Sequence, residues 1–270
     1  MTDTLPRMTV AHLNGIDVYY ERRGEGPRLL FVNGSGATLQ NVAPLVDVYA
    51  GRFDLLAHDQ RGLGRTSIPP GPYSMADYAE DAAALAAHIG WESYRVVGMS
   101  FGGMVAQELA VTYPDRIERL ALLCTSPGGD GGSSYPLDTL VGKPADEVAA
   151  IRTRIMDTRF TPEWLAEHEG DRMLIEMVTA EVEPRPADVL RGEALQLEAR
   201  AGFDAFDRLP RISCPTLVTG GRYDGIAPLA NSEAIAGQIP GAELRVYEGG
   251  HMFFVQDGRA FPDILTFLSK

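Results

Sequence analysis

The amino-acid sequence predicts an α/β fold with a mostly parallel, eight-stranded sheet, helices on both of its faces, and an inserted helical cap. Three observations carry this prediction. Short apolar runs alternate with stretches of helical periodicity, and several runs are apolar on both faces, as in a covered sheet. The alternation stops from about residue 128 to 209, where the pattern is helical only. Alternating strands and helices favour a parallel sheet.

Eight segments have the composition of strands. The first two, residues 9–13 and 16–23, are separated by Asn14-Gly15, a pair that suits the type I′ turn of a hairpin. The other six are short apolar runs at residues 28–33, 53–59, 94–99, 117–126, 215–221 and 242–250.

Helical patterns lie between these strands. The segment 74–90 opens with Ser74 and Asp77 in capping-box spacing, repeats apolar residues at helical intervals and stops at a glycine. A second helix begins at Phe101 and ends before Pro114, because proline disfavours helical geometry in the residue that precedes it. Two more are predicted at residues 228–239 and 261–268.

We predict that residues 1–127 and 210–270 form the core and that residues 128–209 form the cap. The insertion starts with GGDGGSS, a flexible glycine–serine segment, and continues without strands. A cap over the carboxyl edge of the sheet would cover the crevice where open α/β sheets bind ligands. Its apolar side chains are each expected to serve mainly in packing: Met156, Phe160, Trp164, Leu165, Met173, Met177 and Leu190.

Composition and charge narrow the class of protein. The chain has 270 residues, of which 45% are hydrophobic, so it can bury a large core. Its 24 Lys and Arg residues against 37 Asp and Glu residues give a net charge of −13, which argues against nucleic acid or an anionic membrane as partner. We expect a small-molecule partner, and the pattern leaves a homo-oligomer open.

The sequence shows neither a targeting segment nor a cysteine pattern typical of disulfides or metal sites. The first residues lack the apolar region of a signal peptide, and no stretch approaches the roughly 18 apolar residues of a membrane span. Cys124 and Cys214 have neither metal-binding spacing nor the number needed for a disulfide framework, so we expect buried free thiols. These observations predict a cytoplasmic protein.

Ser100 is the candidate nucleophile. It lies in GMSFGG, between the strand predicted at 94–99 and the helix that begins at Phe101. A sharp strand–turn–helix junction needs small neighbours, which Gly98 and Gly102 provide. The helix also directs its positive end at the serine, where a developing oxyanion would be stabilised.

A serine hydroxyl needs a base to accept its proton and a carboxylate to orient that base. His251 follows a predicted strand and two glycines, so its imidazole can reach back over the edge of the sheet. Asp224 lies in a turn just beyond the strand at 215–221. The chain order Ser100, Asp224, His251 is therefore nucleophile, acid, base.

The other four histidines are weaker candidates for the catalytic base. We expect structural roles for His12 and His88 and a place lining a turn for His58, and His168 resembles a metal ligand only faintly.

Together these motifs resemble those of the α/β-hydrolase fold superfamily, and in particular the group of 3-oxoadipate enol-lactonases and cofactor-free haloperoxidases. GMSFGG resembles the nucleophile elbow of the family, GGRYDGIAP its acid loop and GGH its histidine loop. FVNGSGAT resembles the oxyanion loop, and LLAHDQRGLGRTSIP resembles the loop usually written D-x-R-G-x-G-x-S. The resemblance covers nearly the whole chain.

The resemblance implies that the backbone N–H groups of Ser35 and Phe101 form the oxyanion hole. It also suggests substrate contacts at Gly34, Trp164 and Met252.

Some positions depart from the family pattern. Asn33 stands where histidine is commonest, which changes how the oxyanion loop is braced but not which backbone groups donate. Leu63 likewise stands where the family often has histidine, and Ser35 where many relatives carry a bulky aromatic residue. A serine at position 100, where aspartate would be needed, argues against dehalogenase or epoxide hydrolase chemistry.

The sequence therefore predicts a serine hydrolase that cleaves an ester, a lactone or a related acyl bond of a small molecule, with no metal or organic cofactor. The same residues leave other activities open. These are hydrolysis of a C–C bond in a ring-cleavage product, cofactor-free haloperoxidase or perhydrolase chemistry, and ligand reception without catalysis.

Overall fold

The computed structural model describes residues 9–179 and 186–270. These residues include one eight-stranded sheet with the order β1-β2-β4-β3-β5-β6-β7-β8. Its strands are β1 (Thr9–Leu13), β2 (Ile16–Arg23), β3 (Arg28–Val32), β4 (Asp54–His58), β5 (Tyr94–Met99), β6 (Ile117–Leu123), β7 (Thr216–Gly221) and β8 (Glu243–Tyr247). All eight predicted strands are therefore present.

The sheet is mostly parallel, as predicted. Strand β2 is antiparallel to both β1 and β4, and the remaining neighbours run parallel. Asn14 and Gly15 join β1 to β2 with φ values of 51° and 77°. Positive φ at both central residues is what a type I′ turn requires, and asparagine and glycine tolerate it best.

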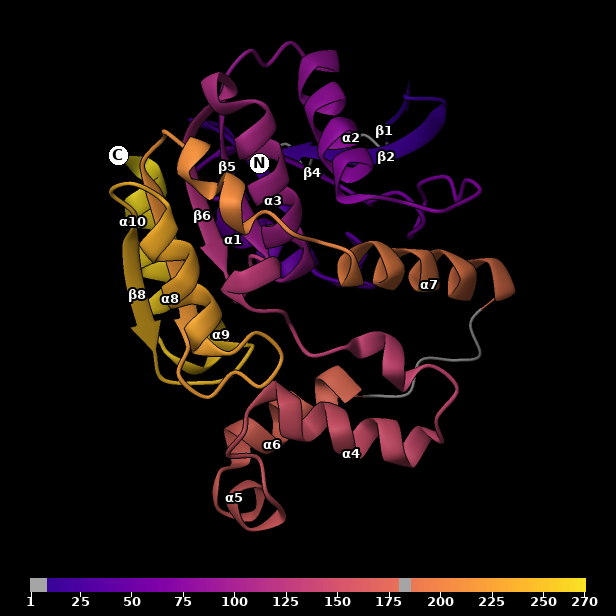
Figure 1. Ribbon diagram of the computed structural model, residues 1–270, viewed down its shortest axis with the longest axis vertical. Helices are drawn as coiled ribbons and strands as arrows, with labels where there is room; N and C mark the ends of the chain where they lie inside the picture. Colours follow the sequence, from indigo (N-terminus) through magenta and orange to yellow (C-terminus); the bar gives the residue numbers. More distant parts are fainter. Residues whose placement is uncertain (1–8, 180–185) are drawn as a thin grey trace, which may run out of the picture.

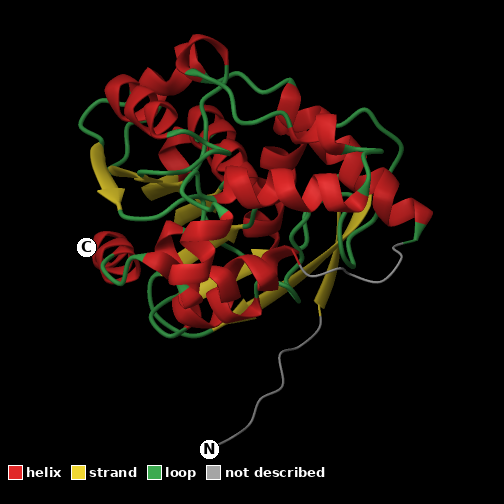
Figure 2. Ribbon diagram, turned by 90° about the horizontal axis from the view of Figure 1, so that it is seen from below, coloured by secondary structure: helices red, strands yellow, loops and turns green. Residues whose placement is uncertain are grey.

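Helices cover both faces of this sheet (Figures 1 and 2). In the part of the chain outside residues 128–209 they are α1 (Ala43–Ala50), α2 (Met75–His88), α3 (Phe101–Thr112), α8 (Leu229–Gln238), α9 (Phe253–Gln256) and α10 (Ala260–Ser269). The short helices α1 and α9 were not predicted. At the start of α2, Ser74 and Asp77 form the expected capping box.

Strand β3 shows why the central strands are apolar throughout. Leu30 and Val32 join the cluster of buried side chains that includes α2, α3 and α8, whereas Leu29 and Phe31 join the cluster that includes α1 and α10. Successive side chains of a strand point to opposite faces, so both faces must be apolar when both are covered.

The segment between β6 and β7 is helical, and its described residues include no strand. Its helices are α4 (Ala145–Met156), α5 (Pro162–Glu167), α6 (Glu169–Thr179) and α7 (Ala187–Ala201). Figure 1 shows α4, α5 and α6 grouped at one end of the molecule. The division of the chain at residues 128 and 209 stays a prediction.

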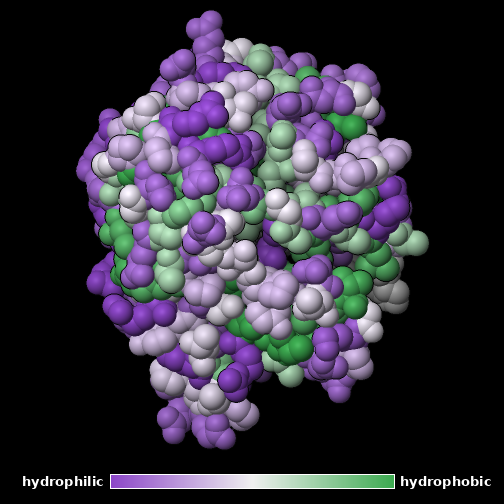
Figure 3. Space-filling view, in the orientation of Figure 1, coloured by the Kyte–Doolittle hydropathy of each residue, from purple (hydrophilic) through white to green (hydrophobic). Residues whose placement is uncertain are grey.

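The apolar side chains of this segment do not all pack as expected. Phe160 is buried, but Met173, Met177 and Leu190 are exposed, and Met173 keeps 61% of its surface accessible. The expectation of packing was wrong for these three residues, because they lie on the outer faces of α6 and α7. The face seen in Figure 3 is largely polar, with smaller hydrophobic areas between the polar side chains.

Both cysteines are free. Cys124 is buried as predicted, but Cys214 is only partly buried. Within residues 9–179 and 186–270, no helix combines the length and apolar character needed to cross a membrane.

Candidate active site

Ser100 occupies a strained turn between β5 and α3. Its φ of 54° and ψ of −117° are unusual for a residue with a side chain. The turn is held by the neighbouring strand, because the Ser100 N–H donates to the Leu123 carbonyl oxygen at 2.8 Å. Thr125 Oγ1 also donates to the Ser100 carbonyl oxygen at 2.7 Å. The fold thus fixes the serine at the carboxyl end of β5.

The glycines around Ser100 allow close backbone approach. A Cβ atom on Gly102 would lie 2.1 Å from the Val32 carbonyl oxygen, and one on Gly98 would lie 2.4 Å from the Gly102 carbonyl oxygen. Either atom would push α3 away from the sheet. The steric role predicted for both glycines is therefore explicit in the packing.

The three predicted catalytic side chains lie in one hydrogen-bonded row. Ser100 Oγ is 3.0 Å from His251 Nε2, and His251 Nδ1 is 2.8 Å from Asp224 Oδ2. The residues follow β5, β8 and β7, whose carboxyl ends lie at the same edge of the sheet. The fold brings all three side chains together, although 151 residues separate Ser100 from His251 along the chain.

The carboxylate is fixed independently of the histidine. Asp224 Oδ1 accepts hydrogen bonds from the backbone N–H groups of Ile226 and Ala227, at 2.8 and 2.9 Å. Its side chain is fully buried, and His251 is 8% exposed. Hydrogen bonds are electrostatically stronger in such a low-dielectric setting, so the orientation of the imidazole is well defined.

The loop after β3 lies against the serine. A Cβ atom on Gly34 would be 3.6 Å from Ser100 Cβ. Asn33 braces this loop by donating from Nδ2 to the Ala37 carbonyl oxygen at 3.0 Å. Gln60 in turn donates from Nε2 to Asn33 Oδ1 at 2.7 Å. Gln60 was not selected from the sequence. Its position within DQRGLG, part of the loop motif identified there, was a usable signal.

The oxyanion role that the resemblance implies for Ser35 and Phe101 stays a prediction. The Phe101 ring packs edge-to-face on Tyr78, so at the turn this residue offers only its backbone. Its N–H belongs to the first turn of α3, where backbone donors lack intrahelical partners. Ser35 Oγ is buried and has no hydrogen-bond partner among the described residues. The next residue, Gly36, donates its N–H to Gln196 Oε1 of α7 at 2.7 Å.

The end of α4 holds the acid and base loops. The His251 N–H donates to the Met156 carbonyl oxygen at 2.6 Å, and the Gly225 N–H donates to the Ile155 carbonyl oxygen at 3.0 Å. A Cβ atom on Gly250 would lie 2.0 Å from the Met156 carbonyl oxygen. The segment predicted as a cap is therefore tied directly to the loops that carry Asp224 and His251.

The two remaining predicted contacts lie in different surroundings. Met252 follows His251 and packs, partly buried, against the apolar cluster of the α10 face. Trp164 lies in α5, where its Nε1 donates to Asp171 at 2.8 Å and its ring stacks on His168 at 3.7 Å. These contacts lie within the segment between β6 and β7, and a role for Trp164 in binding substrate stays a prediction.

His58 lies at the end of β4 and is 3% exposed. No described residue forms a hydrogen bond with its Nδ1 atom, and burial lowers the pKa of its imidazole to about 4. The buried ring is thus neutral at physiological pH. As for metals, the described parts of the chain contain no group of three or more His, Cys, Asp or Glu side chains suited to an ion.

Comparison with known proteins supports the fold described above. Residues 27–149 match the family model described as alpha/beta hydrolase fold. The chain is 29% identical over 245 residues to a poly(3-hydroxyalkanoate) depolymerase from Ectopseudomonas oleovorans, covering 90% of this chain and 84% of that protein. It is 27% identical to 3-oxoadipate enol-lactonase 2 from Acinetobacter baylyi, covering 88% and 87%.

The protein is an enzyme with the α/β-hydrolase fold. Its fold is similar to that of the enol-lactonase from Burkholderia xenovorans LB400, with a TM-score of 0.79 at 24% identity, covering 97% of this chain and all of that one. The hydrolase therefore resembles the enol-lactonase group over nearly its whole length, as the motifs indicated.

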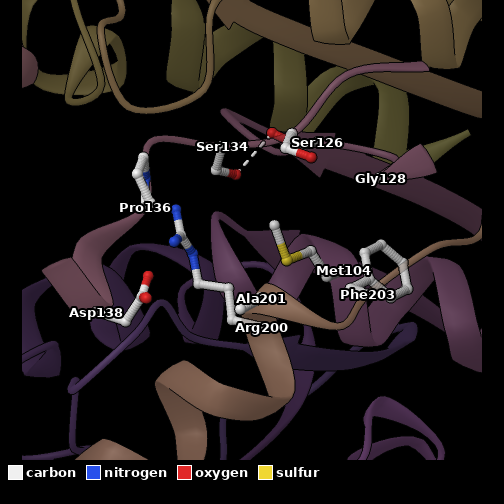
Figure 4. A pocket seen from close by; sticks show the side chains of 10 residues that line it. Met104, Ser126, Gly128, Ser134, Pro136, Asp138, Arg200, Ala201 and Phe203 are labelled. Atoms are coloured by element: carbon white, nitrogen blue, oxygen red, sulfur yellow. Dashed lines mark hydrogen bonds between the residues drawn. The ribbon is translucent and has the colours of Figure 1, made fainter. Parts of the chain in front are cut away.

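A pocket of about 260 Å³ lies beside the elbow of the hydrolase (Figure 4). Met104, one turn after Ser100 in α3, lines it together with Phe203. Ser126 and Ser134 also line it and are joined by a hydrogen bond of 2.7 Å between their hydroxyl groups. Arg200 of α7 extends into this pocket. Sequence reasoning did not select any of these residues, because none belongs to a motif.

Proposed function

We propose that this α/β-hydrolase cleaves an ester, a lactone or a related acyl bond of a small molecule, with Ser100 as nucleophile. The observation that carries the proposal is the buried row from Ser100 through His251 to Asp224, with spacings of 3.0 and 2.8 Å. Both spacings allow proton transfer or charge-assisted hydrogen bonding. The enol-lactonase relatives support a lactone as one substrate class.

In this mechanism His251 Nε2 accepts the Ser100 proton while Oγ attacks the carbonyl carbon. The negative charge that develops on the carbonyl oxygen accepts hydrogen bonds from the Ser35 and Phe101 backbone N–H groups. Removing one such donor typically costs about 3 kcal/mol of transition-state stabilisation. Asp224 keeps the imidazole in the tautomer that can accept the proton, and it stabilises the imidazolium that forms.

His251 then donates its proton to the leaving oxygen, and the C–O bond breaks to leave an acyl group on Ser100. A water molecule loses a proton to His251 and attacks this acyl-enzyme. The acid is released and Ser100 regains its hydrogen. For a lactone the leaving oxygen stays attached to the acyl chain, so a single hydroxy acid is the product.

The test is hydrolysis of p-nitrophenyl acetate and a panel of lactones by the wild type and Ser100→Ala. We expect the variant to lose at least about 10⁴-fold in kcat with an unchanged circular dichroism spectrum. Ser93→Ala is the matched control, because Ser93 lies at the opposite end of β5. A fluorophosphonate probe should add mass to the wild type and the control but not to Ser100→Ala.

Substantial hydrolysis by Ser100→Ala would contradict the assignment of the nucleophile. Dienone acids of the ring-cleavage type belong in the same panel. Turnover of these compounds without turnover of any ester or lactone would replace acyl hydrolysis by C–C bond hydrolysis.

A further inference from the structure

Arg200 is a buried cation with unused donors. The residue is 6% exposed, and its Nη1 donates to the Tyr135 carbonyl oxygen at 2.8 Å. Its Nε and Nη2 atoms are buried and have no hydrogen-bond partner among residues 9–179 and 186–270. Burial lowers the pKa of this guanidinium to about 10, so the group still carries its charge at neutral pH. A buried charge without an anionic partner is costly, so the site favours an anion.

The unused edge of Arg200 is the one that binds carboxylates elsewhere in the molecule. Nε and Nη2 form a fork that matches the two oxygens of a carboxylate. In other arginines this edge holds an aspartate through two hydrogen bonds of 2.6–3.0 Å; these residues are Arg22, Arg61, Arg159 and Arg259. Within the described residues, Arg200 has no such aspartate.

Asp138 is the acidic side chain that faces Arg200 across the pocket. It is exposed and favours the charged guanidinium from a distance, but among the described residues the two form no ion pair within 4.0 Å. Asp138 therefore does not occupy the Nε–Nη2 edge of Arg200.

Gln196 connects Arg200 to the oxyanion loop. It lies one helical turn before Arg200 on the same face of α7, where side chains four residues apart are neighbours. Its Oε1 accepts the hydrogen bond from Gly36, but its Nε2 is buried and has no partner in the part of the chain that the structure describes. Ser35 Oγ is in the same condition. Unpartnered buried polar groups thus continue from the oxyanion loop to the Arg200 pocket.

We infer that Arg200 and Gln196 form a carboxylate subsite, so that the substrate carries a carboxylate a short chain away from the scissile carbonyl. The inference rests on the proposed acyl hydrolysis. Arg200 binds both carboxylate oxygens through Nε and Nη2, and Gln196 Nε2 is a further unused donor on the side of the oxyanion loop. The hydroxyl groups of Ser126 and Ser134 line the opposite side of the pocket.

The charge of the protein makes a local cation important for such a substrate. A net charge of −13 repels anions over most of the surface. A buried guanidinium acts over a short range in a low dielectric, where its attraction is stronger than that of a surface charge. The subsite would thus bind a carboxylate in a protein whose net charge otherwise repels anions.

The first test compares two esters of the same length. In p-nitrophenyl hemisuccinate the acyl chain ends in a carboxylate, and in p-nitrophenyl valerate it ends in an ethyl group. We expect the wild type to have at least a tenfold higher kcat/KM for the hemisuccinate. Arg200→Met should lose about 100-fold on the hemisuccinate, mainly through KM, and less than threefold on the valerate. Arg200→Lys should be intermediate, since it keeps the charge without the fork.

The control is Arg191→Met on the same helix, since Arg191 is exposed and donates to the carbonyl oxygens of Ile68 and Pro69. It should leave the preference for the hemisuccinate unchanged. Equal losses on both esters in Arg200→Met would show a structural role only and would overturn the inference. A wild type that prefers the valerate would overturn it as well.

The second test measures binding without turnover. Glutarate titrated calorimetrically should bind one site per chain in the wild type and in Ser100→Ala, and at least tenfold more weakly in Arg200→Lys. Absence of glutarate binding to the wild type would overturn the subsite, even if Arg200→Met fails to fold. Hydrolysis retained by Ser100→Ala would instead contradict the proposed function, and Arg200-dependent glutarate binding would still support the subsite.

Discussion

The backbone N–H of His251 donates a 2.6 Å hydrogen bond to the carbonyl oxygen of Met156. The first residue belongs to the loop after β8, and the second is the last residue of α4, in the segment between β6 and β7. The position of the imidazole therefore depends on a part of the chain that carries no catalytic residue. Gly225, next to Asp224, makes the same kind of bond to Ile155.

Gly250→Ala tests this connection. The new Cβ atom would lie 2.0 Å from the Met156 carbonyl oxygen, so the histidine loop and the end of α4 must separate. Because a displacement of about 1 Å in a catalytic group can cost on the order of 100-fold, we expect kcat to fall by about that factor. Gly258→Ala is the control, since a Cβ atom there meets nothing within 4 Å. Equal esterase activity in both variants would contradict the prediction.

Gly102→Ala tests the packing of the elbow. Its Cβ atom would lie 2.1 Å from the backbone of Val32, which cannot move without displacing β3, so we expect the free energy of unfolding to fall by about 3 kcal/mol. Gly237→Ala in α8 meets nothing within 4 Å and should be neutral or stabilising by about 0.5 kcal/mol. Urea denaturation of both variants gives the comparison. A Gly102→Ala protein as stable as Gly237→Ala would show that the elbow can relax.

Asp224→Asn tests the orienting role of the carboxylate. The amide oxygen can still accept the hydrogen bonds from Ile226 and Ala227, so we expect a folded protein. The amide nitrogen would then face His251 Nδ1 and favour the tautomer whose Nε2 carries a proton and cannot accept one from Ser100. We expect kcat to fall by about 10⁴-fold with a melting temperature within a few degrees of the wild type. A loss below tenfold would contradict this role.

These three predictions show what could be inferred from sequence. The elbow and the order of Ser100, Asp224 and His251 were predictable because each rests on a local motif at the end of a predicted strand. The hydrogen bonds to the carbonyl oxygens of Met156 and Ile155 were not predictable, because backbone carbonyl groups are present at every position and leave no pattern in the sequence. Arg200 was missed for a related reason: its burial depends on how α7 packs, which the helical periodicity of this segment does not specify.

His58 predicts a pH dependence of stability. Unfolded, the imidazole binds a proton below about pH 6.5, whereas in the fold its pKa is lowered to about 4 by burial. Between these values the unfolded state binds more protons, so the free energy of unfolding falls as the pH falls from 6.5 to 4. The contribution of this group is at most about 3 kcal/mol, and it does not change further below pH 4.

The measurement is the free energy of unfolding of the wild type and His58→Gln at several values from pH 4 to 7.5. The variant should have a shallower slope between pH 4 and 6.5, whatever its stability at neutral pH. His12→Gln is the control, because the His12 side chain is 73% exposed. Identical slopes in the wild type and His58→Gln would show that other groups account for the acid sensitivity.

The tie between α4 and the loops of Asp224 and His251 also limits how this enzyme can be engineered. Exchanging the helical segment for that of a relative is an obvious way to alter specificity. Residues 155–158 would have to stay with the recipient, because they supply the carbonyl groups that the acid and base loops use and the Thr158 N–H that donates to Tyr223. The part available for grafting then includes α7, where Gln196 and Arg200 lie.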